Sequence, residues 1–156
     1  MRGRRIRKPT EIFLSHARAD RKFVNRLVKV LRDHGIRYWY SKTHLGGAQR
    51  WHDEIGRALN RCDWFAVVMS PAATRSEWVK RELLYVLDAG RYGRKIVPLL
   101  HKPCNHARLS WTLGAFQFVD FTRDFEDGCR DLLRIWGQAY RRRGSGNRNT
   151  DAKKAK

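Results

Sequence analysis

Acidic residues and cysteines are scarce in this chain of 156 residues. Asp and Glu number 15 against 34 Lys and Arg, which gives a formal net charge of +19. The three cysteines, Cys62, Cys104 and Cys129, are widely spaced and form no CxxC motif, so free thiols in a reducing compartment are expected rather than a disulfide framework. No apolar run reaches the length of a membrane span, and no apolar segment of a secretory signal follows the basic N-terminus. We therefore expect a cytoplasmic protein that does not bind membranes.

The sequence also lacks the motifs that identify several common kinds of site. It has no zinc-finger spacing, no RNP signature, no GxGxxG or P-loop glycine pattern and no nucleophile elbow. His101, Cys104 and His106 lie close together and Cys129 could add a fourth ligand, but zinc sites show tighter, repeated spacing. We therefore expect no metal site. Ser70 stands where a receiver domain requires an acidic phosphoacceptor, so that class is set aside as well.

The positive charge is concentrated at the two ends of the chain. Residues 1–9 carry +5 and residues 141–156 carry +6, which leaves +8 for residues 10–140. Both ends have almost no apolar residues, so they are predicted to be disordered basic tails on either side of one folded domain. Such tails attract polyanions, including nucleic acid, without sequence preference. Alternatively, they keep the domain in solution or attach it to an acidic partner.

Between the ends, apolar strand-like segments alternate with amphipathic helical segments. The strand-like segments are residues 11–16, 36–40, 64–69, 95–100 and 116–121. The helical segments are residues 20–35, 51–62, a short stretch from Ser70-Pro71, residues 76–90 and residues 124–140. Because parallel strands need a crossover between them, this order predicts an α/β fold. We expect a flavodoxin-like, doubly wound, five-stranded parallel sheet with helices on both faces.

Single residues predict details of these elements. Asp20 is a plausible N-cap of the first long helix, and Ser70 and Ser76 have the positions of N-caps of the two helices that follow residues 64–69. Residues 64–69 are the most apolar segment and are expected to form the central strand. Pro98 cannot donate a backbone hydrogen bond, so its strand is expected to be irregular or edge-like.

In a doubly wound sheet, ligands bind beyond the carboxyl ends of the strands. The first three of these ends are residues 15–18, residues 41–47 and Ser70, and they include Ser15, His16, Arg18, Ser41, Lys42 and Gly47. These residues are therefore the candidates for binding a ligand.

One acid stands out on the helix after the third of these strand ends. Trp78 and Glu82 are four residues apart, so they share one face of that helix, and Glu82 can face the same edge of the sheet. On spacing alone, the commoner arrangement is an exposed acid that pairs with Arg75, Lys80 or Arg81 and contributes little.

Four segments in this order resemble the Toll/interleukin-1 receptor (TIR) domain family in its bacterial form. They are EIFLSHARAD, GIRYWYS, LGGAQRWHDEIGRALNRCD, and WFAVVMSP with SEWVKREL, and the resemblance spans about residues 10–138. The resemblance implies either cleavage of NAD⁺ at the nicotinamide–ribose bond or a role as an assembly scaffold. In the enzymatic members, the essential glutamate lies in a W-x-x-x-E motif, which corresponds to Trp78 and Glu82.

A single carboxylate is chemically sufficient for that reaction. Nicotinamide in NAD⁺ is already cationic and leaves as a neutral base, so the general acid of ordinary glycoside hydrolysis is not needed. The carboxylate stabilises the oxocarbenium-like ribose, and an aromatic wall suits the flat rings of the substrate. NAD⁺ is thus expected as substrate, with no further cofactor.

The resemblance also implies roles at the strand ends. Ser15, His16 and Ser41, together with the loop that contains Gly47, would bind substrate, and Arg18, Lys42 and Arg50 could hold the pyrophosphate. Many members have Tyr or Phe where this chain has His16, and Asp where it has Ser41.

We therefore expect an NAD⁺ nucleosidase that forms ADP-ribose or a cyclic ADP-ribose signal in bacterial immunity or signalling. Self-association, with an effector protein as a further partner, is implied by the resemblance. The alternative is a non-catalytic TIR interaction module whose basic tails bind polyanions.

Overall fold

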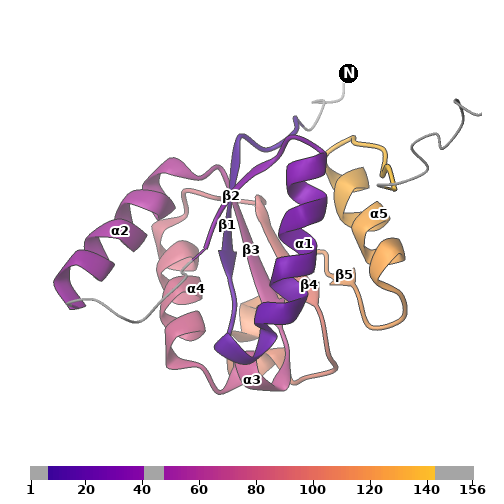
Figure 1. Ribbon diagram of the computed structural model, residues 1–156. Coiled ribbons are helices and arrows are strands. Elements are labelled where there is room, and N and C mark those ends of the chain that lie inside the picture. The colour runs from indigo at the N-terminus through magenta and orange to yellow at the C-terminus, as the bar shows by residue number, and fades with distance from the viewer. Residues whose placement is uncertain (1–6, 41–47, 143–156) are drawn as a thin grey trace, which may run out of the picture.

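The computed structural model describes residues 7–40 and 48–142, apart from the side chains of residues 48–51 (Figure 1). The predicted tails therefore lie almost wholly outside the described residues. So does most of the predicted loop of residues 41–50, including Ser41, Lys42 and Gly47.

Five parallel strands form one sheet in the order β2-β1-β3-β4-β5. Their bounds are β1 Glu11–Ser15, β2 Arg37–Trp39, β3 Trp64–Met69, β4 Ile96–Leu100 and β5 Val119–Asp120. Every residue of β1 and β3 is buried, as expected for strands that are covered by helices on both sides. The predicted fold class and the central position of β3 are confirmed.

Helices cover both faces of the sheet, as Figure 1 shows. On one face lie α1 (Arg21–Asp33) and α5 (Phe125–Ile135), and on the other lie α2 (Ala48–Arg61) and α4 (Glu77–Ala89). The side chains of β3 alternate between the two layers: Trp64, Ala66 and Val68 pack with α1 and α5, and Phe65, Val67 and Met69 pack with α2 and α4. Among the described residues, no helix combines the length and the apolar composition needed to span a membrane.

The predicted N-caps at Ser70 and Ser76 are confirmed. The amide of Ala73 donates to Ser70 Oγ at 3.0 Å, at the start of the short helix α3 (Pro71–Thr74). The amide of Val79 donates to Ser76 Oγ at 3.2 Å, at the start of α4. Both turns that follow β3 are therefore fixed by local side-chain hydrogen bonds.

Two predicted elements near the C-terminus are too long. The last helix ends at Ile135 rather than residue 140, because Gly137 adopts a φ of +67° and the amide of Gln138 turns back to the Leu133 carbonyl. The last strand is reduced to Val119–Asp120, because residues 116–118, which connect it to the 3₁₀ helix η3 (Trp111–Ala115), form neither strand nor helix.

Of the two positions predicted from Pro98, irregular or edge-like, the edge-like one is wrong, because β4 lies inside the sheet between β3 and β5. The amide of Phe121 donates to the Leu100 carbonyl, so the backbone of Leu100, and of Pro98 two residues before it, faces β5. Pro98 aligns with the chain just before Val119, where β5 has not yet begun. The proline is tolerated because its missing donor faces a gap in the ladder.

Candidate active site

Two buried serines mark the carboxyl ends of β1 and β3. Ser15 is the last residue of β1 and Ser70 directly follows β3, and each is only 1% exposed. Between β1 and α1 the chain forms a 3₁₀ turn, η1 (Arg18–Asp20), in which Asp20 is also buried. Three polar side chains are thus held inside the protein at the edge of the sheet where the strands end.

Asp20 and Ser70 form a buried hydrogen bond between these two strand ends. Ser70 Oγ donates to Asp20 Oδ2 at 2.5 Å while it accepts the Ala73 amide. Asp20 occupies the N-cap position of α1, as predicted, but its side chain makes no cap hydrogen bond to the helix. The hydroxyl of Ser70 is therefore engaged within the protein, and Asp20 is a site residue that sequence reasoning missed. The signal available was an acid placed in the turn right after a strand.

Glu82 lies on the inner face of α4 together with Val79, Leu83 and Val86, and it is 6% exposed. The alternative that Glu82 is an exposed acid in a surface ion pair is wrong, since Glu82 forms no ion pair among the described residues. Glu77, five residues earlier, is exposed. The helix therefore directs one of its acids inward and the other toward solvent.

Burial dominates the electrostatics of Glu82. It raises the pKa of the carboxyl from 4.5 to about 8, because the charged form is poorly solvated there. Hydrogen bonding from Ser15 and Trp78 lowers the pKa and so opposes part of this rise. Among the described residues, Ser15 Oγ has no partner of ordinary hydrogen-bond geometry, so its contact with the carboxylate is a weak one. A neighbouring cation would favour the charged form, which makes this position suited to a cationic ligand.

Two of the predicted site residues, Trp78 and His16, each pack against another ring. Half-buried Trp78 faces His52 of α2, with 6.1 Å between ring centroids and an interplanar angle of 57°. His16, directly after β1, packs edge-on against Tyr40 at 5.4 Å. His52 was not anticipated from the sequence, because nothing in its helical pattern distinguishes it from other exposed polar residues.

The remaining predicted site residues divide into two groups. Arg18 is exposed at the start of η1. Ser41, Lys42 and Gly47, together with the side chain of Arg50, lie outside the described residues, so their predicted roles stay predictions.

The His and Cys residues of the loop after β4 serve as packing groups. His101 stacks on Phe23 with 4.3 Å between centroids, and His106 packs edge-on against Phe118 at 5.0 Å. Across residues 7–40 and 48–142, no three His, Cys, Asp or Glu side chains gather in a way that could hold a metal ion.

Comparison with known proteins gives a consistent picture. A family model of the TIR domain matches residues 12–133. A protein of Bacteroides thetaiotaomicron named 2′ cyclic ADP-D-ribose synthase BtTIR is 28% identical over 97 residues, which are 61% of this chain and 34% of that protein. This chain therefore spans about a third of that relative's length.

Solved structures share the fold at low identity. The TIR domain of the Toll-related receptor TRR-2 of Hydra magnipapillata has a TM-score of 0.65 and 22% identity, covering 81% of this chain and 98% of that one. The CMP N-glycosidase BcmB of Clostridium botulinum has a TM-score of 0.57 and 18% identity, covering 79% and 98% of the two chains.

Proposed function

The chain belongs to the TIR domain family, and we propose that it is an NAD⁺ nucleosidase that breaks the bond between nicotinamide and ribose. The observation that carries this proposal is the burial of Glu82 at the edge of the sheet where β1 ends, next to Ser15 and Trp78. The similarity to a protein named as a cyclic ADP-ribose synthase supports it.

In the proposed reaction, the bond between ribose C1′ and the nicotinamide nitrogen breaks, and its electron pair neutralises the pyridinium. The ribose becomes an oxocarbenium-like cation, which the carboxylate of Glu82 stabilises. Water then adds to C1′ and releases a proton, giving ADP-ribose. If a hydroxyl of the same molecule adds instead, the product is cyclic.

The raised pKa of Glu82 has a direct meaning for this reaction. Without substrate the buried carboxyl is largely protonated near neutral pH, because its pKa is about 8. A cationic nicotinamide ring beside it would favour the carboxylate. Substrate binding would therefore generate the charged form that the transition state needs, and NAD⁺ would bind with release of a proton.

The other residues would bind and orient the substrate. Trp78 would form an aromatic wall, Ser15 and His16 would contact the ribose, and Arg18 would attract the pyrophosphate. The segment from Ser41 through Lys42 to Gly47 would help complete the site beside a second copy of the chain. Activity would then rise more steeply than linearly with protein concentration, and the product would act as a signal in bacterial defence.

The test is nicotinamide release from NAD⁺ by concentrated wild-type protein, with CMP as a second substrate because a protein of this fold is named a CMP N-glycosidase. Glu82→Ala should lose nicotinamide release by two orders of magnitude or more, which is about the size of effect expected for one electrostatic group. The matched control is Glu77→Ala, which removes an exposed acid of the same helix and should act like wild type. Equal rates for wild type and Glu82→Ala would leave the alternative of a non-catalytic interaction module. Cleavage of CMP but not NAD⁺ would redirect the proposal to another nucleotide.

A further inference from the structure

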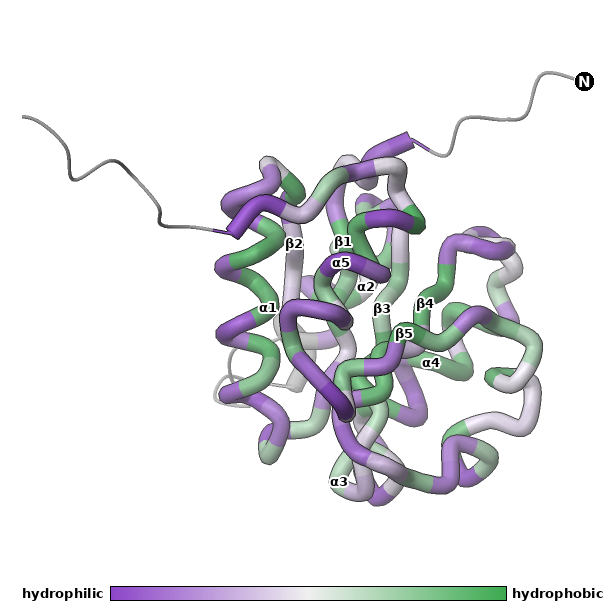
Figure 2. Tube along the Cα trace, turned by 90° about the vertical axis from the view of Figure 1, so that its right-hand side faces the viewer, coloured by the Kyte–Doolittle hydropathy of each residue, from purple (hydrophilic) through white to green (hydrophobic). Residues whose placement is uncertain are grey.

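The basic charge of the folded domain is concentrated on one helix. Helix α1 carries five basic residues and one acidic residue, whereas α4 and α5 each carry two basic and three acidic residues. The basic residues of α1 are all exposed, because Phe23, Val24, Leu27, Val28 and Leu31 occupy its inner face. Figure 2 shows hydrophilic and hydrophobic segments alternating along α1, as expected for a helix with one polar and one apolar side. The exposed side of α1 is thus a predominantly basic stripe, which ends at the acid Asp33.

Three of the five basic residues of α1, Lys22, Arg26 and Lys29, have no acidic partner within the described residues. On the adjacent helix α5, the acids Glu126, Asp127 and Asp131 already pair with arginines of α5 or of the segment after it. Within the described residues, Lys22 and Lys29 form no ion pair, and Arg26 lies over the ring of Phe125 at 4.0 Å. Lys22, Arg26 and Lys29 therefore present uncompensated charge at the surface of the described part of the domain.

Both described ends of the chain come together at the C-terminal end of α1. Lys8 lies against Gly35, where a Cβ atom would stand 2.8 Å from Lys8 Nζ. On the other side, the backbone amide of Arg141 donates to His34 Nε2 at 2.9 Å, and the ring of His34 stacks on Tyr140. The described parts of the two basic segments, residues 7–9 and 141–142, therefore both have a contact at one end of the stripe.

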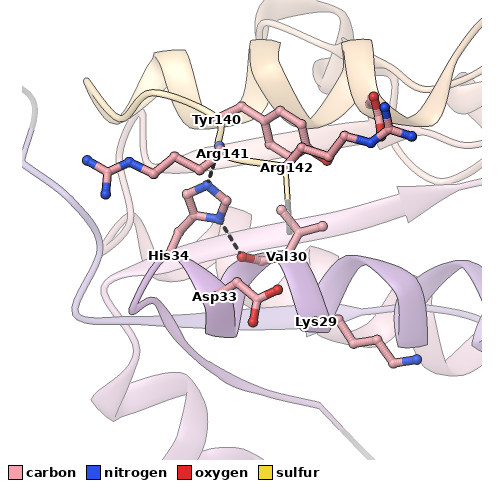
Figure 3. Close-up of a pocket in the computed structure, with 8 residues that line it drawn as sticks. Lys29, Val30, Asp33, His34, Tyr140, Arg141 and Arg142 are labelled. Carbon is pink, nitrogen blue, oxygen red and sulfur yellow. Dashed lines mark hydrogen bonds and ion pairs between the residues drawn. The ribbon is translucent and has the colours of Figure 1, made fainter. Parts of the chain in front are cut away.

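A cavity of about 240 Å³ lies at this junction (Figure 3). Its lining includes Lys29 of the stripe, Arg141 and Arg142 of the segment after α5, and the acids Asp33 and Glu126. Glu126 pairs with Arg142, so the cavity adjoins the basic face but is itself mixed in charge. We name the surface formed by Lys8, the exposed side of α1, Arg141 and Arg142 the α1 face. It lies across the sheet from Glu82, because α1 and α4 cover opposite faces.

We propose that the α1 face is a docking surface for double-stranded nucleic acid, bound through its phosphates. Helix α1 has 13 residues and is about 20 Å long, which matches about six base pairs of duplex. Proteins that bind single strands use aromatic side chains as stacking platforms, and the exposed residues of α1 include none. Contacts to phosphates alone would give binding without sequence preference. This surface is independent of the proposed enzymatic site.

The test measures binding of the full chain to a labelled DNA duplex of arbitrary sequence as salt is varied. The variant Lys22→Gln/Arg26→Gln/Lys29→Gln should weaken binding about tenfold or more. It should also reduce the slope of log K against log salt by about 3, since each phosphate contact contributes about 0.9. The matched control, Arg57→Gln/Arg94→Gln/Arg108→Gln, removes the same charge from exposed positions elsewhere and keeps both ends of the chain. It should leave the slope close to that of wild type.

A second variant, Lys22→Gln/Lys29→Gln, keeps the packing of Arg26 on Phe125 and should reduce the slope by about 2. Equal losses in the α1 variants and the control would overturn the proposal, because binding would then follow net charge alone. Failure of the wild type to bind duplex, or equally tight binding of a single strand of the same length, would overturn it as well.

Discussion

The hydroxyl of Ser70 donates to the buried carboxylate of Asp20 at 2.5 Å and ties the turn after β3 to the turn after β1. The same oxygen accepts the amide of Ala73 and so caps α3. One side chain therefore holds together the two strand ends that border the candidate active site. The stability of this edge of the sheet depends on a polar pair inside an apolar core.

Ser70→Ala should destabilise the protein more than the loss of a helix cap alone. It removes the cap of α3 and leaves the Asp20 carboxylate buried without this donor, for an expected loss of about 2–4 kcal/mol. The control Ser76→Ala removes only the cap of α4 and should cost about 1 kcal/mol. Urea unfolding of both variants measures the difference, and equal losses would show that the Asp20 contact contributes nothing.

The raised pKa of Glu82 predicts how stability depends on pH. The folded protein binds this proton more tightly than the unfolded chain, so the contribution is fully present below about pH 4.5 and is lost as pH rises to about 8. Glu82→Gln keeps a neutral group at every pH. Relative to wild type, it should gain stability between these values, by an amount on the order of a few kcal/mol. Thermal unfolding of both proteins across this range tests the sign, and a wild type that gains stability relative to the variant would contradict it.

The same pKa predicts the pH profile of the proposed NAD⁺ cleavage. Free protein must lose the proton of Glu82 to act, so kcat/KM should rise with pH and level off above about 8. The pH profile of kcat should rise at lower pH than the profile of kcat/KM, because bound cationic substrate favours the carboxylate form of Glu82. Nicotinamide release measured at low and saturating NAD⁺ separates the two profiles. A rate that falls as pH rises would exclude the ionised form as the active one.

Two glycines in helices should respond to alanine in opposite ways. At Gly128 a Cβ would meet the Phe121 ring at 2.3 Å, so Gly128→Ala should push α5 away from the sheet at a cost of about 1–3 kcal/mol. A Cβ added at Gly56 would meet no described atom within 4 Å outside the backbone of its own helix, so Gly56→Ala should stabilise α2 by about 0.5–1 kcal/mol through helix propensity alone. Chemical denaturation of both variants measures the two changes in stability. Each variant is the control for the other, because both replace a helical Gly with Ala.

His34 should hold the segment after α5 in place through one specific nitrogen. Its Nε2 accepts the amide of Arg141, so Nδ1 carries the hydrogen that is donated to the Val30 carbonyl at 2.7 Å. His34→Phe keeps an aromatic ring next to Tyr140 but removes the acceptor, and exchange of the Arg141 amide hydrogen should speed up several-fold. The amide of Gln138, which donates to the Leu133 carbonyl, should exchange at its wild-type rate. Unchanged exchange at Arg141 would show that the ring stacking alone fixes this segment.

Periodicity predicted the elements with the strongest apolar patterns. Residues 64–69 form the central strand, and Ser70 and Ser76 are caps, because a buried strand and a capped helix are specified by neighbouring residues. The position of Pro98 could not be predicted in this way. It depends on where β5, whose pairing begins at Val119, joins the ladder.

The sequence by itself determined the order of strands and helices, the TIR resemblance and the choice of Glu82, because burial patterns and motifs are local properties of the chain. Tertiary structure alone decided that Glu82 is buried and that the Asp20 side chain accepts a hydrogen bond from Ser70 instead of capping α1. It also decided that both described ends of the domain lie against the C-terminal end of α1. The physical reason is separation along the chain: Ser70 and Asp20 are 50 residues apart, and Arg141 and His34 are 107 apart. Contacts over such distances exist only once the sheet has assembled and its helices have packed.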